Sequence, residues 1–389
     1  VLIHNGNLTN TRELEKQLFS VDRRHTNSSS DTEMLLNIFA TELQEQINNK
    51  KDLDPELIFK AVTSLHKRIQ GSYAVISLIS GHGLLAFRDP YGIRPLVIGK
   101  RISSENKNEW MVASESLVLE NNDYEIVRDV NPGEAVYISI NGEFYSKQCS
   151  NNPKLFPCAF EYVYLARPDS IMNGISVYKA RLRMGDFLAE TIKKSIKDGQ
   201  IDVVMPIPDS SRPAAMQVAR QLGIEYREGF FKNRYVGRTF IMPGQQKRKQ
   251  SVRQKLNAMS AEFKNKNVLI VDDSIVRGTT SKQIIQMAKF AGANKVFFTS
   301  AAPPVRYPHV YGINMPTRDE LIAHNRTIDD IAKKLEIDSL VYQSVEDLRK
   351  SIIADTSIKD LEMCCFTGSY VTGTVDEAYL NWIENEYIS

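Results

Sequence analysis

Two adjacent carboxylates, Asp272 and Asp273, follow the apolar run Val268–Val271 in the second half of the sequence. A loop rich in Gly and hydroxyl groups comes next, and an amphipathic helix is predicted over Lys282–Gly292. The start of a helix offers free backbone N–H groups and a positive dipole end to an anion. Carboxylates suit sugar hydroxyls, or Mg²⁺ that bridges to phosphates. The stretch therefore predicts a ligand with hydroxyls in its middle and a phosphate at one end.

A plainer interpretation also exists, because two acids after a strand are often a solvated loop and Gly278–Ser281 could simply cap a helix. The combination of all these features favours a binding site. The stretch resembles the phosphoribosyl diphosphate (PRPP) segment of type I phosphoribosyltransferases. The resemblance implies that the acid pair binds the ribose hydroxyls. It also implies that the following loop binds the 5′-phosphate through Ser274, Arg277, Gly278, Thr279, Thr280 and Ser281.

A second strand, Ile201–Pro208, runs into Asp209–Arg212 and a helix that Gly223 ends. Alternation of strand and helix predicts a parallel, doubly wound sheet, in which the two polar loops leave the same edge. By the resemblance, Asp209, Ser210 and Ser211 form a pyrophosphate loop, although Ser211 also fits a helix N-cap. The expected Mg²⁺ ligands, direct or through water, are Ser210, Asp272 and Asp273.

A long basic insertion begins at Phe231 and lies between these two strand–helix units. Basic runs usually form a solvated surface, but here Tyr, Phe and Gly alternate with the cations. Long loops inside compact domains are often lids. The resemblance implies a loop that closes over PRPP, in which Lys232, Tyr235 and Arg238 meet pyrophosphate oxygens.

Composition excludes several other classes of protein. The 389 residues suffice for two domains, and 49 Lys and Arg balance 47 Asp and Glu, so no nucleic-acid partner is expected. No apolar run approaches the roughly 20 residues of a membrane helix, and no signal peptide is present, so no membrane partner is expected. Four cysteines in this length argue against a disulfide framework and predict a cytoplasmic protein.

The first half of the sequence predicts helices followed by strands. Val1–Ile3 predict a strand, and Asn5-Gly6 predicts either a plain turn or an oxyanion hole made of a side-chain amide and a backbone N–H. Helices are predicted behind Ser30-Asp31 and from Asp54-Pro55. Short β-rich segments divided by Gly, Pro and Asp run from Gly71 to Tyr145, which favours an α+β layered domain.

This half resembles the glutamine amidotransferase domain of the N-terminal-nucleophile type, an αββα layered fold. His4–Asn10 match its oxyanion segment, with Asn5 and Gly6 as the oxyanion hole, and Asp31 matches the residue that holds the amino group of glutamine. The family nucleophile is a cysteine in a Cys-Gly-Ile start, but this sequence has no cysteine before Cys149. We therefore expect an incomplete first domain that lacks the glutaminase nucleophile and does not hydrolyse glutamine.

The polar, Pro-containing link 151–157 divides the chain. The expected domains are 1–150 for the amidotransferase, 158–360 for the phosphoribosyltransferase and 361–389 for a C-terminal segment that packs back on the core. Some relatives carry an iron–sulfur cluster on four cysteines. Two of those four positions hold Cys158 and Cys365, and the others hold His309 and Glu362. Because four thiolates are the usual requirement, no iron–sulfur cluster is predicted.

Together the two halves resemble the glutamine PRPP amidotransferase family. The resemblance implies that PRPP, glutamine and water become 5-phosphoribosylamine, glutamate and pyrophosphate in purine biosynthesis, with ammonia passed between two sites. It also implies Mg²⁺, feedback by purine nucleotides and a homo-oligomer. The alternatives are a phosphoribosyltransferase that attaches a nucleobase and a PRPP-binding regulator without catalysis; the amidotransferase half argues against the first, and the acid pair and basic loop argue against the second.

Overall fold

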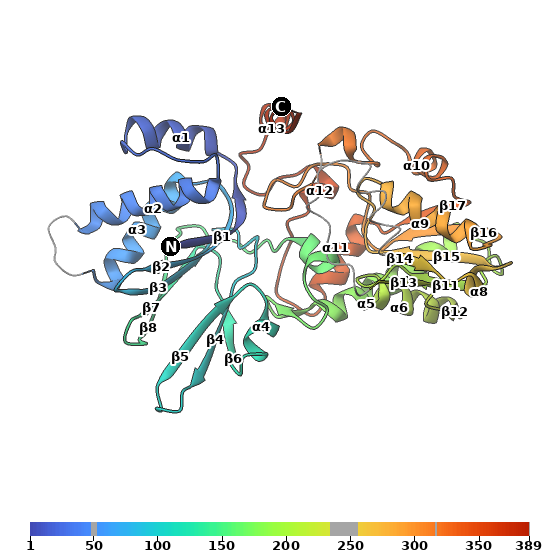
Figure 1. The fold of residues 1–389 in the computed structure, drawn as a ribbon, viewed down its shortest axis with the longest axis horizontal. Helices are drawn as coiled ribbons and strands as arrows, with labels where there is room; N and C mark the ends of the chain where they lie inside the picture. Colours follow the sequence, from blue (N-terminus) through green and yellow to red (C-terminus); the bar gives the residue numbers. More distant parts are fainter. Residues whose placement is uncertain (48–52, 234–255, 316, 389) are drawn as a thin grey trace.

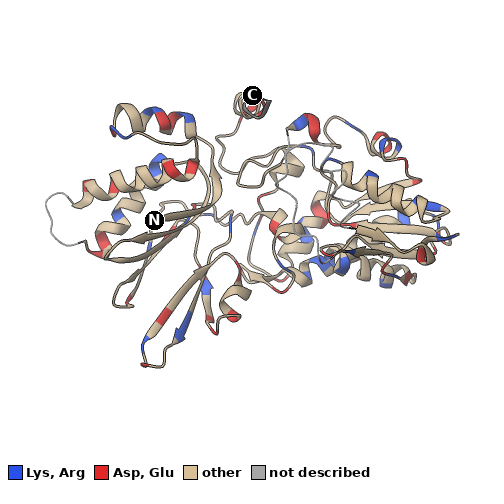
Figure 2. Ribbon diagram, viewed as in Figure 1, with Lys and Arg blue, Asp and Glu red and all other residues tan. Residues whose placement is uncertain are grey.

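A computed structural model describes residues 1–47, 53–233, 256–315 and 317–388, with side chains described up to 385. The chain forms two halves joined near residue 150, an antiparallel half and a parallel half (Figure 1). Figure 2 shows Lys and Arg interspersed with Asp and Glu over the elements of both halves. Among the described helices, none combines the length and the apolar character that a bilayer crossing requires.

The first half is built on a five-stranded antiparallel sheet in the order β1-β2-β3-β7-β8. Leu35, Ile38 and Val62 of the covering helices are fully buried, together with Val75 and Phe87 of the sheet. The strands are β1 (Leu2–Leu8), β2 (Gly71–Ile79), β3 (Gly83–Arg88), β7 (Glu134–Ser139) and β8 (Phe144–Gln148), and the helices are α1 (Thr11–Ser20), α2 (Asp31–Ile47) and α3 (Pro55–Arg68).

The sequence-based expectation of a possible turn at Asn5-Gly6 is wrong. Strand β1 continues to Leu8 and pairs with β2 in antiparallel register, with Asn5 opposite Ala74 and Gly6 opposite Tyr73. Gly6 has a φ of +150°, and a Cβ there would lie 2.0 Å from the Ser72 carbonyl oxygen. Long-range pairing with β2 therefore decides the local structure, and glycine is required by close approach of the backbone.

A second, three-stranded antiparallel sheet in the order β5-β4-β6 packs on the other face of the first. Leu96, Ile98 and Val130 form a small core with Ala86 and Val136 of the large sheet. The half therefore presents a helix layer and two sheets, as the predicted layered fold requires. Its remaining elements are β4 (Val97–Ile102), β5 (Asn108–Ala113), α4 (Ser116–Glu120) and β6 (Glu125–Asp129).

The second half contains a five-stranded sheet, all parallel, in the order β12-β11-β15-β16-β17. Alternate residues of one strand enter different cores: Leu269 and Val271 face α5, α6 and α11, whereas Val268 and Ile270 face α9 and α10. Helices thus cover both faces, which confirms the predicted doubly wound sheet. The strands are β11 (Val203–Pro206), β12 (Glu225–Tyr226), β15 (Asn267–Asp272), β16 (Lys295–Ser300) and β17 (Ser339–Tyr342), and the helices are α5 (Val177–Ser195), α6 (Arg212–Leu222), α9 (Thr279–Phe290), α10 (Ile328–Leu335) and α11 (Val345–Ile353).

Shorter elements connect the sheet to its surroundings. A π-helix, η1 (Glu161–Leu165), and the hairpin β9 (Ile171–Met172) and β10 (Ile175–Ser176) precede α5. Near the sheet edge lie the antiparallel pair β13 (Phe230–Lys232) and β14 (Leu256–Ala258), then α8 (Ser260–Phe263). A 3-10 helix, η2 (Arg318–Glu320), precedes α10, and α12 (Cys364–Thr367) precedes the final helix.

The final helix, α13 (Glu377–Ile388), lies between α1 and the parallel half (Figure 1). The Arg12 guanidinium of α1 lies 4.5 Å from the centre of the Trp382 ring. On the other side, Arg318 Nε donates to Glu384 Oε1 at 2.8 Å and Arg318 Nη1 donates to Glu377 Oε2 at 2.7 Å. The helix is therefore held by both halves.

Replacing a phenylalanine in the parallel-sheet core should be costly. Phe298→Ala removes a fully buried ring from β16, and the cavity should lower the free energy of unfolding by about 3–5 kcal/mol. Phe290→Ala is the matched control, because this ring is 97% exposed and its loss should change the free energy by less than about 0.5 kcal/mol. Urea unfolding of both variants measures the difference. Equal destabilisation would contradict the assigned core.

Candidate active sites

The sequence-predicted acid pair lies at the carboxyl end of β15, the central strand of the parallel sheet. Asp272 and Asp273 are each only 8% exposed. Burial raises the pKa of both carboxyls, and the Asp273 charge raises the pKa of Asp272 further. The pair therefore favours a bound cation or a set of hydroxyl donors, because two buried charges of like sign repel each other.

The two predicted loops meet at this pair. Ser210 Oγ donates to Asp273 Oδ2, and Ser274 Oγ donates to Asp273 Oδ1 at 2.6 Å. Asp273 N donates to Asp272 Oδ1 at 2.9 Å. Strands β11 and β15 are direct neighbours in parallel register, with Pro206 opposite Val271, which brings their following loops together.

Three other residues of the predicted pyrophosphate site have further partners. Lys232 Nζ donates to Asp209 Oδ2 at 3.0 Å, and Arg212 Nη1 donates to Asp209 Oδ1 at 3.0 Å. Ser211 is 1% exposed, and its hydroxyl donates to the Ile207 carbonyl, so its side chain does not cap α6 as the sequence suggested. Tyr235 and Arg238, the remaining predicted lid contacts, lie outside the described residues.

The loop before α9 is fixed by a glycine and an ion pair. Gly278 is the N-cap of α9 with a φ of +75°, and a Cβ there would lie 2.2 Å from Ile322 Cδ1. Arg277 Nε donates to Glu320 Oε2 at 3.0 Å, so this predicted phosphate contact already has a partner. Thr279 and Thr280 are exposed, whereas Ser281 is buried. The amide N–H groups of the first helical turn face outward without intrahelical acceptors, as at any helix start.

Sequence analysis missed Arg181 of α5, which is 3% exposed. Its Nε donates to the Tyr162 carbonyl at 2.9 Å and its Nη2 to the Ala166 carbonyl at 2.8 Å, and its charge lowers the pKa of Asp273 against the effect of burial. A signal was present in the sequence, because Arg181 stands on the apolar stripe of α5 with Val177, Met184 and Leu188.

In the first half, strand β1 carries the predicted oxyanion pair, Asn5 and Gly6. It also contacts Asp31, the residue predicted to bind the amino group of glutamine. Leu8 N donates to Asp31 Oδ2 at 3.1 Å, and His4 Nδ1 lies 3.6 Å from the same oxygen. Burial raises the pKa of Asp31, but the interactions with His4 and the Leu8 amide outweigh it and hold the pKa below its ordinary value. Asp31 is therefore an anion that can receive an ammonium group. His4 is a neighbour that the sequence analysis did not assign.

Strand β1 also touches the second half directly. Asn7 Nδ2 donates to the Val310 carbonyl at 2.9 Å. A Cβ on Gly312, whose φ is +94°, would lie 2.6 Å from the Gly6 Cα. The segment 309–312 of the parallel half therefore backs the predicted oxyanion strand at main-chain distance.

A buried polar cluster stands beside this contact. His309 Nε2 lies 3.3 Å from Cys158 Sγ and 3.2 Å from Glu362 Oε2, and the three side chains are buried. Tyr311 N donates to His309 Nδ1 at 3.3 Å, which assigns the ring proton to Nε2. Nε2 then donates toward the Cys158 thiol. Glu362 Oε1 accepts from the Cys364 amide at 2.8 Å, whereas Glu362 Oε2 has no hydrogen-bond partner among the described residues.

These residues do not fit an iron–sulfur cluster, which needs four thiolates. Cys365, at the fourth expected position, is buried but is not among the three side chains whose ligand atoms converge within 4.8 Å. All four cysteines of the chain are buried free thiols. The absence of a cluster stays a prediction.

Comparison with known proteins identifies both halves. The glutamine amidotransferase domain family matches residues 1–121, and the phosphoribosyl transferase domain family matches residues 176–309. The protein therefore joins an amidotransferase to a phosphoribosyltransferase.

Relatives then identify the particular family. The chain is 57% identical over 384 residues to an amidophosphoribosyltransferase of Pseudomonas aeruginosa, which covers 98% of this chain and 76% of the relative, and 54% identical over 384 residues to that of Escherichia coli, with the same coverage. A solved glutamine PRPP amidotransferase of B. subtilis, complexed with ADP and GMP, has a TM-score of 0.79 and 37% identity over 95% of this chain and 76% of that chain. The chain belongs to the amidophosphoribosyltransferase family, glycosyltransferases of purine biosynthesis with a glutamine amidotransferase domain. The alternative of a nucleobase transferase or a regulator is not favoured.

Substitution of Gly278 should disturb both folding and activity. Gly278→Ala places a Cβ in a left-handed conformation and against Ile322, which should cost about 1 kcal/mol for the backbone and about 1–3 kcal/mol for overpacking. Gly223→Ala is the matched control, because Gly223 has a φ of +66° with nothing within 4 Å of the added Cβ. Unfolding free energy and pyrophosphate release measure the two effects. Equal behaviour of the variants would show that the contact with Ile322 is unimportant.

Proposed function

We propose that the loops after β11 and β15 form the PRPP site of this amidophosphoribosyltransferase. The observation that carries the proposal is the hydrogen bond from Ser210 to Asp273, which joins the two loops. The ribose hydroxyls donate to Asp272 and Asp273, and the 5′-phosphate lies on the loop that starts at Ser274 and includes Arg277, Gly278, Thr279, Thr280 and Ser281. The pyrophosphate meets Asp209, Ser210, Ser211 and Lys232, with Tyr235 and Arg238 as lid residues.

The residues present fit Mg²⁺. Two buried carboxylates and one hydroxyl are hard oxygen donors, and the pKa values of Asp272 and Asp273 are raised mainly because burial disfavours their charged forms, which a bound cation would stabilise. Ser210, Asp272 and Asp273 would hold the ion directly or through water. When bound, the ion would neutralise charge on the leaving pyrophosphate.

The remaining chemistry follows from positions of charge. The bond between ribose C1 and a pyrophosphate oxygen breaks, ammonia forms a new C1–N bond, and the amine releases one proton to solvent. Lys232 Nζ lies at Asp209, where its charge can meet pyrophosphate oxygens. Ammonia is itself a good nucleophile, so the site requires no strong general base. It must exclude water, because water would hydrolyse PRPP.

In this proposal the first half binds glutamine; because no cysteine precedes Cys149, the nucleophile that would release ammonia is not among these residues, and ammonium salt replaces that step in the assay below. The Asn5 amide and the Gly6 N–H stabilise the oxyanion formed at the glutamine side-chain carbonyl, and anionic Asp31 holds the amino group of glutamine. The lowered pKa of Asp31 supports its role. The contact of Gly6 and Asn7 with segment 309–312 supports internal transfer of ammonia between the halves.

Further assignments belong to the same proposal. The domains are 1–150, 158–360 and 361–389. The protein works in the cytoplasm as a homo-oligomer, with purine nucleotides as feedback ligands. The B. subtilis structure complexed with ADP and GMP supports the nucleotide assignment.

One assay distinguishes the proposal from its alternatives. The protein is incubated with PRPP, Mg²⁺ and ammonium salt, and pyrophosphate release is measured. Release that depends on ammonium supports the proposal. Release that depends on an added nucleobase would favour a nucleobase transferase, and no release from folded protein would favour a regulator.

Removing the acid pair should abolish this reaction. Asp272→Asn with Asp273→Asn deletes both carboxylates that bind ribose and metal, so ammonia-dependent activity should fall by at least about 100-fold. Glu190→Gln with Asp198→Asn is the control, since it removes two exposed carboxylates at the end of α5 and should keep full activity. Unchanged PRPP turnover in the first variant would refute the assigned role.

Acid should weaken Mg²⁺ binding at this site. Because the pKa values of Asp272 and Asp273 are raised, protons compete with Mg²⁺ at a higher pH than at ordinary carboxylates. The Mg²⁺ concentration for half-maximal activity should therefore rise as the pH falls from about 8 to about 6. A titration at fixed, saturating PRPP measures it, and a constant requirement would contradict the metal assignment.

A further inference from the structure

The predicted phosphate loop rests on a second loop, residues 320–326, which sequence analysis left unassigned. Ile322 N donates to the Val276 carbonyl at 2.9 Å, and the Ile322 side chain lies over Gly278. Glu320 pairs with Arg277 at 3.0 Å. Three consecutive positions of the phosphate loop, 276, 277 and 278, therefore contact this second loop, so its placement affects where the phosphate-binding amides lie.

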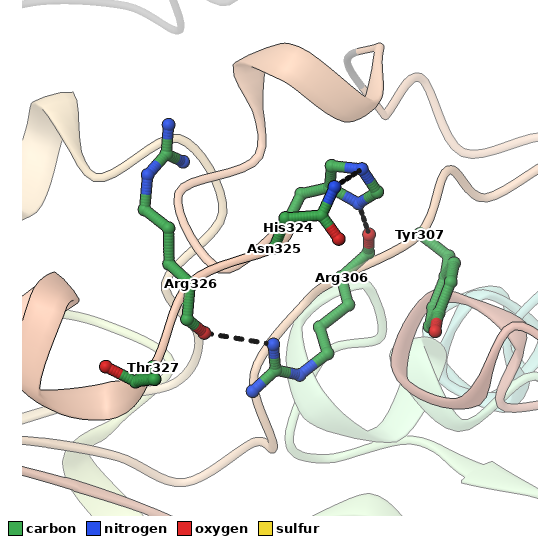
Figure 3. Close-up of a pocket in the computed structure, with 6 residues that line it drawn as sticks. All are labelled: Arg306, Tyr307, His324, Asn325, Arg326 and Thr327. Carbon is green, nitrogen blue, oxygen red and sulfur yellow. Dashed lines mark hydrogen bonds between the residues drawn. The ribbon is translucent and has the colours of Figure 1, made fainter.

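Arg306 fastens the second loop in place. Its Nη1 donates to the Ala323 carbonyl at 2.8 Å and to the Arg326 carbonyl at 3.1 Å, and its own carbonyl lies 2.9 Å from His324 Nδ1 (Figure 3). Arg306 N donates to the Cys365 carbonyl at 2.9 Å, which anchors the residue to the core. Arg306, His324 and Arg326 line a hollow of about 230 Å³ together with Tyr307, Asn325 and Thr327.

The guanidinium group suits this role. Within the described part of the chain, Arg306 forms no ion pair with a carboxylate, so its charge is directed to main-chain oxygens. Hydrogen bonds from a charged donor are stronger than neutral ones. Both bonds come from one nitrogen, Nη1, whose two N–H groups have fixed directions in the guanidinium plane, whereas a lysine ammonium is a single point on a flexible stem. Arg326 tightens the turn itself, because its Nη1 donates to the Ile322 carbonyl at 3.1 Å.

We propose that Arg306 is a positioning residue for PRPP, which acts through residues 320–326 to hold the phosphate loop 274–281 in its binding geometry. The proposal rests on the proposed function, in which that loop binds the 5′-phosphate. Arg306 touches no substrate. It acts on the sugar-phosphate end of PRPP alone, because the pyrophosphate end is bound by residues 209–211, which are held by β11 and α6.

Two product-like inhibitors separate the ends of the substrate. Ribose 5-phosphate carries the 5′-phosphate, and pyrophosphate with Mg²⁺ carries the leaving group. In Arg306→Met, the inhibition constant for ribose 5-phosphate and the KM for PRPP should rise at least about 10-fold, whereas the inhibition constant for pyrophosphate should change less than about 2-fold. Arg306→Lys should lie between the wild type and Arg306→Met.

The matched control is Arg183→Met. Arg183 also ties down main-chain oxygens, since its Nε donates to the Ser351 carbonyl at 2.6 Å, but it joins α5 to α11, away from the phosphate loop. It should leave both inhibition constants unchanged. Equal weakening of both inhibitors in Arg306→Met would mean a general loss of structure and would overturn the proposal.

A loop variant separates this proposal from the proposed function. Thr279→Ala should weaken inhibition by ribose 5-phosphate if the loop binds the 5′-phosphate. An unchanged inhibition constant would count against the proposed function itself. If Thr279→Ala weakens inhibition by ribose 5-phosphate and Arg306→Met does not, only the role of Arg306 is refuted. If Arg306→Met fails to fold, Ile322→Ala tests the same connection and should give the same split between the inhibitors; no split in that variant would also refute the proposal.

Discussion

The burial of two adjacent carboxylates at the end of β15 is the constraint on which the parallel half depends. Charges of like sign in a site only 8% exposed are costly unless donors surround them. Ser274 supplies a hydroxyl from the same loop, Ser210 supplies one from the neighbouring strand, and Arg181 supplies a charge from α5. The order of strands is therefore tied to the chemistry, because only β11 as the direct neighbour of β15 places Ser210 within reach.

A second connection runs through main-chain atoms between the halves. Asn7 bonds to the Val310 carbonyl, and Gly6 lies against Gly312. Beside them, Cys158 directly after the link, His309 from the parallel half and Glu362 from the C-terminal segment meet in one buried cluster. Polar side chains from segments distant in the sequence are thus joined where the predicted oxyanion strand meets the phosphoribosyltransferase.

Local patterns predicted most of the fold but not the long-range contacts. The strand, acid pair and helix follow from the sequence pattern and all three occur, although α9 begins at Thr279 and ends at Phe290, whereas the predicted helix spans Lys282–Gly292. The turn considered at Asn5-Gly6 does not form, because pairing of β1 with β2 outweighs the preference of this dipeptide for a turn. Arg306 gave no local signal at all, since its partners at 323 and 326 are carbonyls, which every residue possesses. The types of residues in a sequence can predict a site built from side chains. They cannot predict which backbone carbonyls an arginine will bind.

The contact between Gly6 and Gly312 has a mechanical consequence. Some other contacts involve rotatable side chains, such as Arg12 on Trp382, which can yield by changing rotamer. Two peptide planes in direct contact have no such freedom, because they lack any intervening group that can rotate. A shift of the segment that contains Gly312 is therefore transmitted to β1 as a rigid displacement. At this point the separation of the two segments is set by van der Waals radii alone.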